Sequence, residues 1–293
     1  MPDNAILRFG LPKGSLQQST IDLFNRAGFR VHVPDRSYFP IIDDPQIQAV
    51  MFRAQEMSRY VEDGVVDAGI TGQDWIIENG SDVLEVCELA YSKGTSQPAR
   101  WVLAVPEESK VQAPENLAGG IIATELVHTT SRYFDQRKIP VKKVEFSWGA
   151  TEVKARLVDA IVDITETGSS LTANKLRVLE TILTSTTRLI ANHEAMKNSA
   201  KKQKIENLVL LLKGAIAARK KVGVKMNVPK DKLEAILSLL PAQQSPTVSP
   251  LADDHWIALE VVVEERTQRD LVPELHRAGA QGIVSYPLNQ VIA

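Results

Sequence analysis

The first third of the chain alternates between short apolar runs and segments in which apolar side chains recur every three or four residues. Apolar runs that predict buried strands occupy residues 6–12, 46–52 and 65–71. Helical spacing follows the first run, with Ser15 in place as an N-cap, and two further helices are predicted to end at Gly64 and Gly80. Strands separated by helices predict a parallel sheet with right-handed crossovers.

The same alternation restarts at Trp101. Strands are predicted at 101–106, 120–126 and 142–148, and helices at 128–137 and 150–159. A strand at 160–165 is followed by a loop, a helix from about Leu171, a strand at 188–192 and a long helix to about Lys220. That helix carries a basic run, which we expect to be a solvated face: Lys197, Lys201, Lys202 and Lys204.

The last segment has a different order of elements. Residues 222–228 alternate with period two, 230–240 form a predicted helix, and 245–251 a short edge strand between prolines. A strand at 255–265, a helix at 268–279 and a final strand at 282–288 complete the set. This β-α-β-β-α-β order predicts a ferredoxin-like domain, a fold with many uses.

Composition excludes several classes of protein. The 293 residues carry a formal net charge of −2, so no broad basic field is available to gather nucleic acid or an anionic membrane. The single cysteine, Cys87, permits no internal disulfide, and the five histidines are too dispersed for a metal site. We find no signal peptide and no apolar run near the roughly 20 residues of a membrane helix, so a cytoplasmic location is expected.

Candidate chemistry is concentrated at residues 160–176, AIVDITETGSSLTANKL. Asp163 ends an apolar strand, where its carboxylate can accept hydrogen bonds from a ribose diol. The next helix start offers amide groups and a favourable dipole to a phosphate, and Gly168 lets the backbone approach closely. Three hydroxyls add donors: Thr167, Ser169 and Ser170. An N-cap and turn alone would also explain these hydroxyls, but the preceding aspartate favours a sugar-phosphate site.

This segment resembles the phosphoribosyl pyrophosphate loop of the ATP phosphoribosyltransferase family. Three other stretches resemble family signatures in the expected order: LPKGSL at 11–16, DAGITGQD at 67–74 and SPTVSPLA at 245–252. The last stretch is similar to the regulatory domain of the long form of the family. The resemblance therefore extends over the whole chain.

The resemblance implies an α/β catalytic core of two domains, like a type II periplasmic binding protein, with a C-terminal ACT-like regulatory domain. The implied boundaries are 1–95 plus 188–215, then 96–187, then 216–293. It implies ATP and phosphoribosyl pyrophosphate as substrates, Mg²⁺ as cofactor, histidine as allosteric inhibitor, and a homo-oligomer that is a dimer or hexamer. Asn227 and Thr247 are the candidates for histidine binding, although Asn227 offers no charge to an ammonium group.

Further candidates follow strand ends. Lys13 is expected to contact the pyrophosphate or an ATP phosphate, with a solvated lysine as the alternative. Arg53 could reach the same cleft. A second strand-to-helix turn could hold an anion or nucleotide, or be only a capped turn: Thr71, Gly72 and Asp74.

Glu166 and Leu171 complete the proposed loop. Glu166 must point to solvent or towards magnesium, because beside a phosphate it would repel it. The tryptophans are expected to pack rather than to stack on a base: Trp75, Trp101, Trp148 and Trp256.

Two other functions share this architecture. A periplasmic-type binding protein would carry a signal peptide and has no need of the Asp163 loop. A catalytically silent regulatory paralogue would have losses in the phosphate loop, and the loop is intact.

Overall fold

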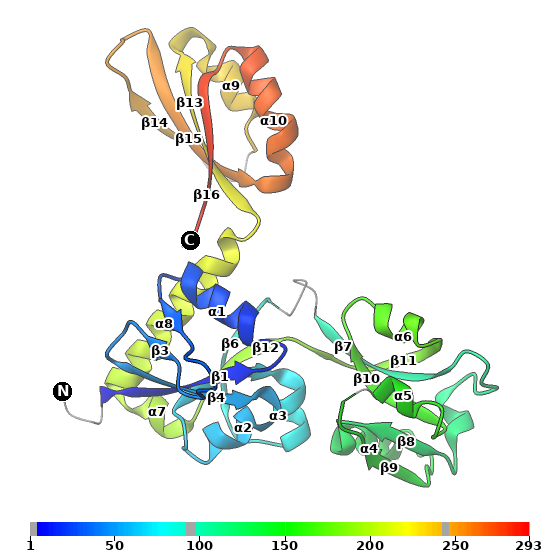
Figure 1. Cartoon of the computed structure of the whole chain (residues 1–293). Coiled ribbons are helices and arrows are strands. Elements are labelled where there is room, and N and C mark those ends of the chain that lie inside the picture. Colours follow the sequence, from blue (N-terminus) through cyan, green and yellow to red (C-terminus); the bar gives the residue numbers. More distant parts are fainter. Residues whose placement is uncertain (1–4, 92–97, 150, 242–245, 293) are drawn as a thin grey trace. The chain divides into compact units, whose positions relative to one another are not determined.

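The computed structural model describes residues 5–91, 98–149, 151–241 and 246–292. The chain divides into two compact units, Met1–Val209 and Leu210–Ala293 (Figure 1). The boundary falls inside one long helix, α8 (Ser199–Ala218). No helix among the described residues is long and apolar enough to cross a membrane.

The first unit contains two five-stranded sheets, which define its two lobes. The sheet of lobe I has the order β4-β1-β5-β12-β6. Its strands are β1 (Leu7–Lys13), β4 (Ile47–Arg53), β5 (Ala68–Gly72), β6 (Leu84–Leu89) and β12 (Thr187–Ala191). The first three are parallel, so their carboxyl ends lie along one edge, whereas β12 is antiparallel to both neighbours.

Helices and a small hairpin complete lobe I. The helices are α1 (Gln17–Arg26), α2 (Ala54–Glu62), α3 (Gln73–Asn79) and α7 (His193–Lys197), and a two-stranded sheet joins β2 (Val31–His32) to β3 (Ile41–Ile42). Helix α2 lies close to β1 and β5 because Gly10 and Gly69 leave room for Met57, whose sulfur would clash with a Cβ at either position.

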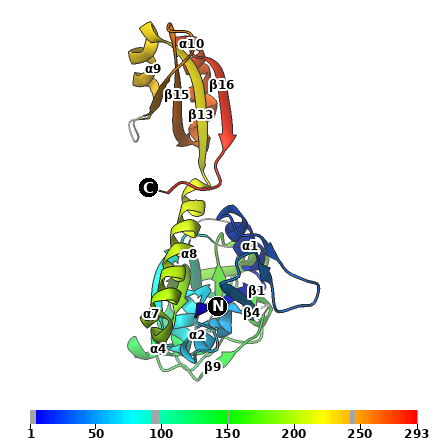
Figure 2. The same ribbon diagram turned by 90° about the vertical axis from the view of Figure 1, so that its left-hand side faces the viewer.

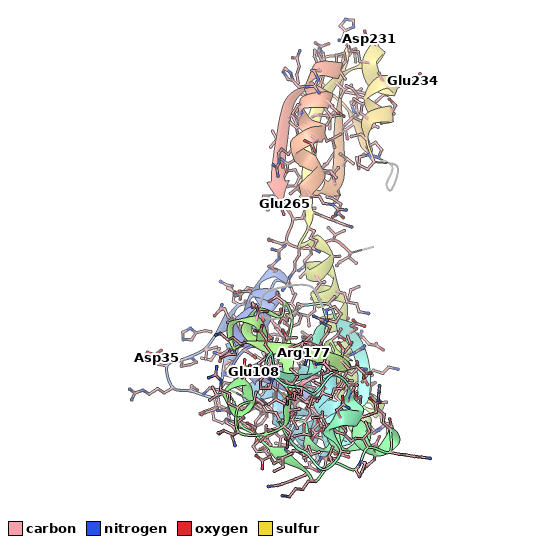
Figure 3. All side chains as sticks on the ribbon, turned by 90° about the vertical axis from the view of Figure 1, so that its right-hand side faces the viewer. Asp35, Glu108, Arg177, Asp231, Glu234 and Glu265 are labelled. Atoms are coloured by element: carbon pink, nitrogen blue, oxygen red, sulfur yellow. The ribbon has the colours of Figure 1, made fainter. Side chains whose placement is uncertain are left out.

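The sheet of lobe II has the order β11-β7-β10-β8-β9. Its strands are β7 (Ala99–Pro106), β8 (Ile121–Thr124), β9 (Lys143–Phe146), β10 (Ala160–Thr165) and β11 (Leu176–Ser185), with helices η2 (Pro114–Leu117), α4 (Val127–Gln136), α5 (Thr151–Lys154) and α6 (Ser169–Ala173). Arg177 of β11 donates to the carbonyl groups of Ser109 (3.3 Å) and Val111 (2.7 Å) (Figure 3). The chain enters lobe II between β6 and β7 and returns between β11 and β12, which gives the expected two-lobed α/β core.

Several predicted elements differ from the structure, among them the helix predicted at 150–159, of which α5 covers only Thr151–Lys154. Strand β5 begins at Ala68 rather than Val65, because residues 65–67 form a bend in which Asp67 accepts hydrogen bonds from Arg8. The helix expected from Leu171 begins at Ser169 and ends at Ala173, and residues 176–185 form the long strand β11 instead. Strand β11 pairs with β7, and its residues Leu179, Ile182 and Leu183 pack against the core of lobe II, a tertiary contact that the local pattern does not show.

The prediction that the basic run of α8 is solvated is wrong for two of its lysines. Lys201 is 12% exposed and bonds to Asp67 at 2.8 Å, and Lys204 is 17% exposed and bonds to Asp44. Lys197 and Lys202 are exposed, as expected. The buried pairs bind the start of α8 to lobe I.

The second unit confirms the predicted β-α-β-β-α-β order. Its elements are β13 (Lys221–Pro229), η3 (Lys230–Lys232), α9 (Leu233–Leu239), β14 (Thr247–Pro250), β15 (Trp256–Glu264), α10 (Glu265–Ala278) and β16 (Gln281–Pro287). The antiparallel sheet has the order β14-β15-β13-β16, and both helices pack on one face of it over a single core (Figure 2). Acidic side chains occupy the first turns of its helices, where the positive end of the helix dipole stabilises their negative charge: Asp231, Glu234 and Glu265 (Figure 3).

Candidate active site

A pocket of about 650 Å³ lies between the carboxyl edge of the lobe I sheet and the loop that follows β10. Lobe I contributes the ends of β1, β4 and β5, and lobe II contributes residues 164–170 apart from Gly168. Eight of the predicted site residues line this pocket: Lys13, Arg53, Gly72, Asp74, Glu166, Thr167, Ser169 and Ser170. The arrangement follows the rule that open α/β sheets bind ligands beyond the carboxyl ends of their strands.

Lys13 and Arg53 provide the positive charge of the lobe I side. They are register partners at the ends of the parallel strands β1 and β4, so they lie side by side. Each cation rests on an aromatic ring: the Lys13 ammonium is 3.6 Å from the ring centre of Tyr38, and the Arg53 guanidinium is 5.0 Å from that of Trp148. Two adjacent cations at a pocket edge suit a diphosphate or triphosphate.

The loop after β10 turns sharply at Gly168, which has φ +81°. Its amide donates to Thr165 Oγ1 at 2.8 Å, and the hydroxyls of Thr167 and Ser169 lie 3.0 Å apart. The hydroxyl of Ser170 donates to the Glu152 carboxylate. The Gly168 amide is thus used inside the loop, whereas Thr167, Ser169 and Ser170 line the pocket with hydroxyls that also bond to protein groups.

Asp163 lies in β10, two residues before the strand ends at Thr165, and does not line the pocket surface. One carboxylate oxygen accepts a hydrogen bond from the Ile164 amide at 2.8 Å. Burial and the neighbouring carboxylates of Glu152 and Glu125 raise the pKa of Asp163 to about 7. A ligand hydroxyl or a cation that approached this acidic group would stabilise its ionised form.

Two predicted residues have packing roles. Thr71 is fully buried, and its hydroxyl donates to the Ala54 carbonyl at 2.7 Å, which holds the start of α2 against β5. Leu171 belongs to the apolar cluster beneath α6. Neither side chain faces the pocket, so we assign them the role of supporting the residues that do.

Helix α3 of lobe I is clasped to lobe II by two buried carboxylates one turn apart. Asp74 accepts a hydrogen bond from the Trp101 indole at 2.6 Å, and its own amide donates to Ser185 Oγ at 3.0 Å. Glu78 accepts from the amides of His128 and Thr129, both at 2.8 Å. We call Asp74 and Glu78 the interlobe clasp.

The interlobe clasp provides a helix cap that the residues of lobe II do not provide. Helix α4 has Leu126 at its N-cap, which has no side-chain acceptor, and Glu78 takes that role from the other lobe. Gly72 is required because a Cβ there would collide with the Asp74 carboxylate. Burial raises the pKa of Asp74, and its hydrogen bonds only partly offset this effect. Asp74 therefore lines the pocket with a side chain already engaged by protein groups.

Sequence reasoning missed one residue that lines the pocket and two that contact its lining residues. Glu125 lines the pocket and accepts from the Gly149 amide at 3.2 Å, and Glu152 bonds to Ser170. The only sequence signal for Glu125 and Glu152 was an acidic side chain close to the end of a predicted strand. Trp148 is 55% exposed, with its ring beside that of Phe146, whereas Trp101 is 1% exposed, and the expectation that Trp148 packs rather than stacks on a base stays a prediction.

The proposed histidine residues share one face of the four-stranded sheet in the second unit. Asn227 pairs with Ala258 across β13 and β15, and Thr247 pairs with Glu260 across β14 and β15. Their strand positions alternate with the buried core positions, so both lie on the face opposite α9 and α10. The Asn227 side chain lies beside Gly282.

Among the described residues, no group of three or more His, Cys, Asp or Glu side chains is arranged to hold a metal ion. Magnesium is commonly held by substrate phosphates with one or two carboxylates, and the acidic set of the pocket side offers such ligands: Glu125, Glu152 and Glu166. Of these carboxylates, those of Glu125 and Glu166 line the pocket, so the pocket has acidic ligands for a divalent cation that is held mainly by substrate phosphates.

Comparison with known proteins identifies the family. A profile described as ATP phosphoribosyltransferase matches residues 53–214, and one described as HisG, C-terminal domain, matches residues 218–290. The chain belongs to the ATP phosphoribosyltransferase family. The ATP phosphoribosyltransferase of Prosthecochloris aestuarii is 56% identical over 98% of both chains, and that of Thermodesulfovibrio yellowstonii is 55% identical over 98% of both.

A solved structure agrees with this family. The structure described as the ATP phosphoribosyl transferase (HisG:HisZ) complex from Thermotoga maritima matches with a TM-score of 0.61 and 25% identity. The match covers 72% of this chain and 99% of that one. The part of this chain beyond that match is of the size of the separate second unit.

Proposed function

We infer that this protein transfers the phosphoribosyl group of phosphoribosyl pyrophosphate to N1 of ATP, which gives phosphoribosyl-ATP and pyrophosphate in the first step of histidine biosynthesis. The observation that carries this inference is the family match over almost the whole chain, including the second domain. A pocket between two lobes, with two cations on one side and a hydroxyl-rich loop on the other, is suited to two anionic substrates.

We propose that the sugar phosphate binds the loop from Asp163 to Leu171. The 5′-phosphate would accept hydrogen bonds from Thr167, Ser169 and Ser170 and from the first-turn amides of α6. Asp163 would accept from a ribose hydroxyl and favour positive charge at the anomeric carbon. Lys13 and Arg53 would neutralise the phosphates on the lobe I side.

The reaction is a substitution at the anomeric carbon. The lone pair of adenine N1 forms a bond to that carbon, and the bond to the pyrophosphate oxygen breaks with its electron pair leaving on pyrophosphate. The protein aligns the two anions and stabilises the charge of the leaving group, and it excludes water as a competing nucleophile. When bound, a divalent cation, which we propose to be Mg²⁺ with Glu125 and Glu166 as candidate ligands, would supply further neutralisation of the leaving group.

The second domain is proposed to be an ACT-like regulatory domain that binds histidine at Asn227 and Thr247. We further propose that the protein acts in the cytoplasm, where ATP and the sugar diphosphate are formed, as a homo-oligomer, dimer or hexamer. Asn227→Ala should weaken histidine binding in calorimetric titration. Unchanged affinity in that variant would place the histidine site elsewhere.

The experiment for the main inference is release of pyrophosphate and formation of phosphoribosyl-ATP from the two substrates with Mg²⁺. Both products should appear in equal amounts. Binding of both substrates without product would instead identify a silent regulatory paralogue.

A further inference from the structure

Trp148 is an exposed indole that contacts Arg53, a residue of the active-site pocket. It follows β9 in lobe II and is 55% exposed, and its neighbour Phe146 is equally exposed. The two rings are 5.8 Å apart and tilted by 43°. The next residue, Gly149, donates its amide to Glu125, which lines the pocket. The two exposed rings therefore lie on a short segment that is tethered to a pocket residue.

The ring of Trp148 is paired with a pocket cation of the opposite lobe. The Arg53 guanidinium lies 5.0 Å from its centre, and Arg53 lines the pocket beside Lys13. Arg53 is exposed, so its contact with the ring is weak. A charge-assisted bond to a phosphate is stronger, so a bound triphosphate would draw the guanidinium away and uncover the indole.

The aromatic rings that line the pocket are already engaged by protein groups. Trp101 is 1% exposed with its indole bonded to Asp74, and Trp75 packs edge-on against it at 6.0 Å. Tyr91 is 3% exposed, and its hydroxyl bonds to Thr20. Two exposed rings lie against the phosphate-binding cations, Tyr38 on Lys13 and Trp148 on Arg53, and the two-ring indole of Trp148 offers the larger π-face for a base.

We propose that Trp148 is the stacking platform for the purine base of ATP, with the triphosphate held by Arg53 and Lys13. This proposal rests on the proposed function and assigns the base of one substrate to a residue. A flat purine placed on the indole would take the position that Arg53 vacates. Stacking is tolerant of base identity but favours large rings, so purine nucleotides bind better than pyrimidine nucleotides.

Steady-state kinetics tests the platform. Loss of one base–aromatic stack corresponds to an affinity loss of about tenfold or more. Trp148→Ala should therefore raise KM for ATP about tenfold, with KM for phosphoribosyl pyrophosphate changed less than twofold. Trp148→Phe, which keeps a π-face, should restore most of the ATP affinity. Equal KM values for ATP in the wild type and Trp148→Ala would overturn the proposal.

Fluorescence provides a readout that does not depend on turnover. ATP should quench the tryptophan emission of the wild type, and Trp148→Phe should remove that quenching. Trp256→Phe, a matched change in the separate second unit, should leave it intact. Inorganic tripolyphosphate should bind Trp148→Ala and the wild type equally well, because it has no base. Quenching that survives in Trp148→Phe would overturn the proposal.

The outcomes separate this proposal from the function itself. If ATP quenched the emission of Trp148 but no product formed, the stacking platform would be supported and the proposed transferase activity would be contradicted. If the protein formed product and Trp148→Ala had the same ATP affinity as the wild type, the transferase activity would be supported and the stacking platform would be contradicted. A change in oligomer size of Trp148→Ala by light scattering, with its ATP affinity retained, would identify the exposed rings as a contact between copies and overturn the platform.

Discussion

At the scale of single residues, charge and backbone conformation decide what the candidate site can do. Asp163 is buried beside two other carboxylates, so its ionised form is unfavourable until a ligand compensates it. Gly168 adopts a conformation that other residues rarely take. Lys13 and Arg53, by contrast, are held by weak ring contacts that a phosphate can displace. The unbound site is therefore built to gain interactions when charged ligands arrive.

The raised pKa of Asp163 predicts a pH-dependent stability. In the folded state its pKa is about 7, above the usual 3.8, so the group favours folding when protonated, and this contribution is lost as the pH rises from about 4 through about 7. Asp163→Asn should therefore be more stable than the wild type at pH 8, by about 2–4 kcal/mol at most, and equal to it near pH 4. Denaturant unfolding at both pH values measures the difference. An equal gain in the free energy of unfolding at pH 4 and at pH 8 would contradict the raised pKa of Asp163.

Substitutions of Gly168 are predicted to weaken ligand binding more than they weaken folding. A Cβ at this position would meet no other heavy atom within 4 Å, so Gly168→Ala is limited by its φ of +81° rather than by space. We expect a stability loss of about 1 kcal/mol and a larger loss of affinity for the sugar diphosphate. Gly168→Val, with a branched side chain, should abolish that affinity with the fold retained in circular dichroism. Retained affinity in the valine variant would show that the phosphate binds elsewhere.

At the scale of elements, α3 is the structural link between the two lobes. Its two buried carboxylates accept hydrogen bonds from β7 and from the start of α4. An element that belongs to lobe I by sequence is thus bonded to lobe II, so its position depends on the separation of the lobes. The pocket lies beside this link, since Asp74 also lines it.

The interlobe clasp is predicted to affect both substrates. Glu78→Gln keeps one acceptor for the amides of α4 but presents an NH₂ group to the other, so we expect a stability loss of about 1 kcal/mol. Because the lobes then lose their fixed spacing, KM should rise several-fold for ATP and for the sugar diphosphate, together with a lower kcat. Asp82→Asn, an exposed control close to α3 in sequence, should change none of these. A loss of stability with unaltered kinetics would limit the clasp to a structural role.

At the scale of the whole molecule, α8 belongs to both compact units. Its first half is anchored to lobe I by Lys201 and Lys204, and its second half contacts the C-terminal segment through the Gly214 carbonyl, which accepts from Val291 at 3.0 Å. A Cβ at Gly214 would press on Ile292. The first half of α8 therefore packs within the first unit, and its second half packs within the second unit.

The anchoring of α8 predicts a stability effect of one buried ion pair. Burial by itself raises the pKa of Asp67, but hydrogen bonds from Arg8 and Lys201 outweigh it and hold the pKa below its usual value. Lys201→Met should lower the free energy of unfolding by about 2 kcal/mol, because Asp67 would keep only Arg8. Lys202→Met, at an exposed neighbouring position, should change it little. The effect is present above the unfolded pKa of about 4 and should shrink as the pH falls below it, which denaturant unfolding at pH 7 and pH 3 can measure.

The sequence by itself determined the α/β alternation, the order of elements in the second unit and the loop around Gly168, because period and turn chemistry are local properties. It also placed Lys13 and Arg53 at strand ends, and parallel strands bring such ends together. Only the tertiary structure decided that residues 176–185 form a strand, that Lys201 is buried, that Glu78 caps a helix of the other lobe and that Trp148 faces solvent. Each of these depends on a partner distant in sequence, and no local pattern records which groups a folded chain brings within a few ångströms of one another.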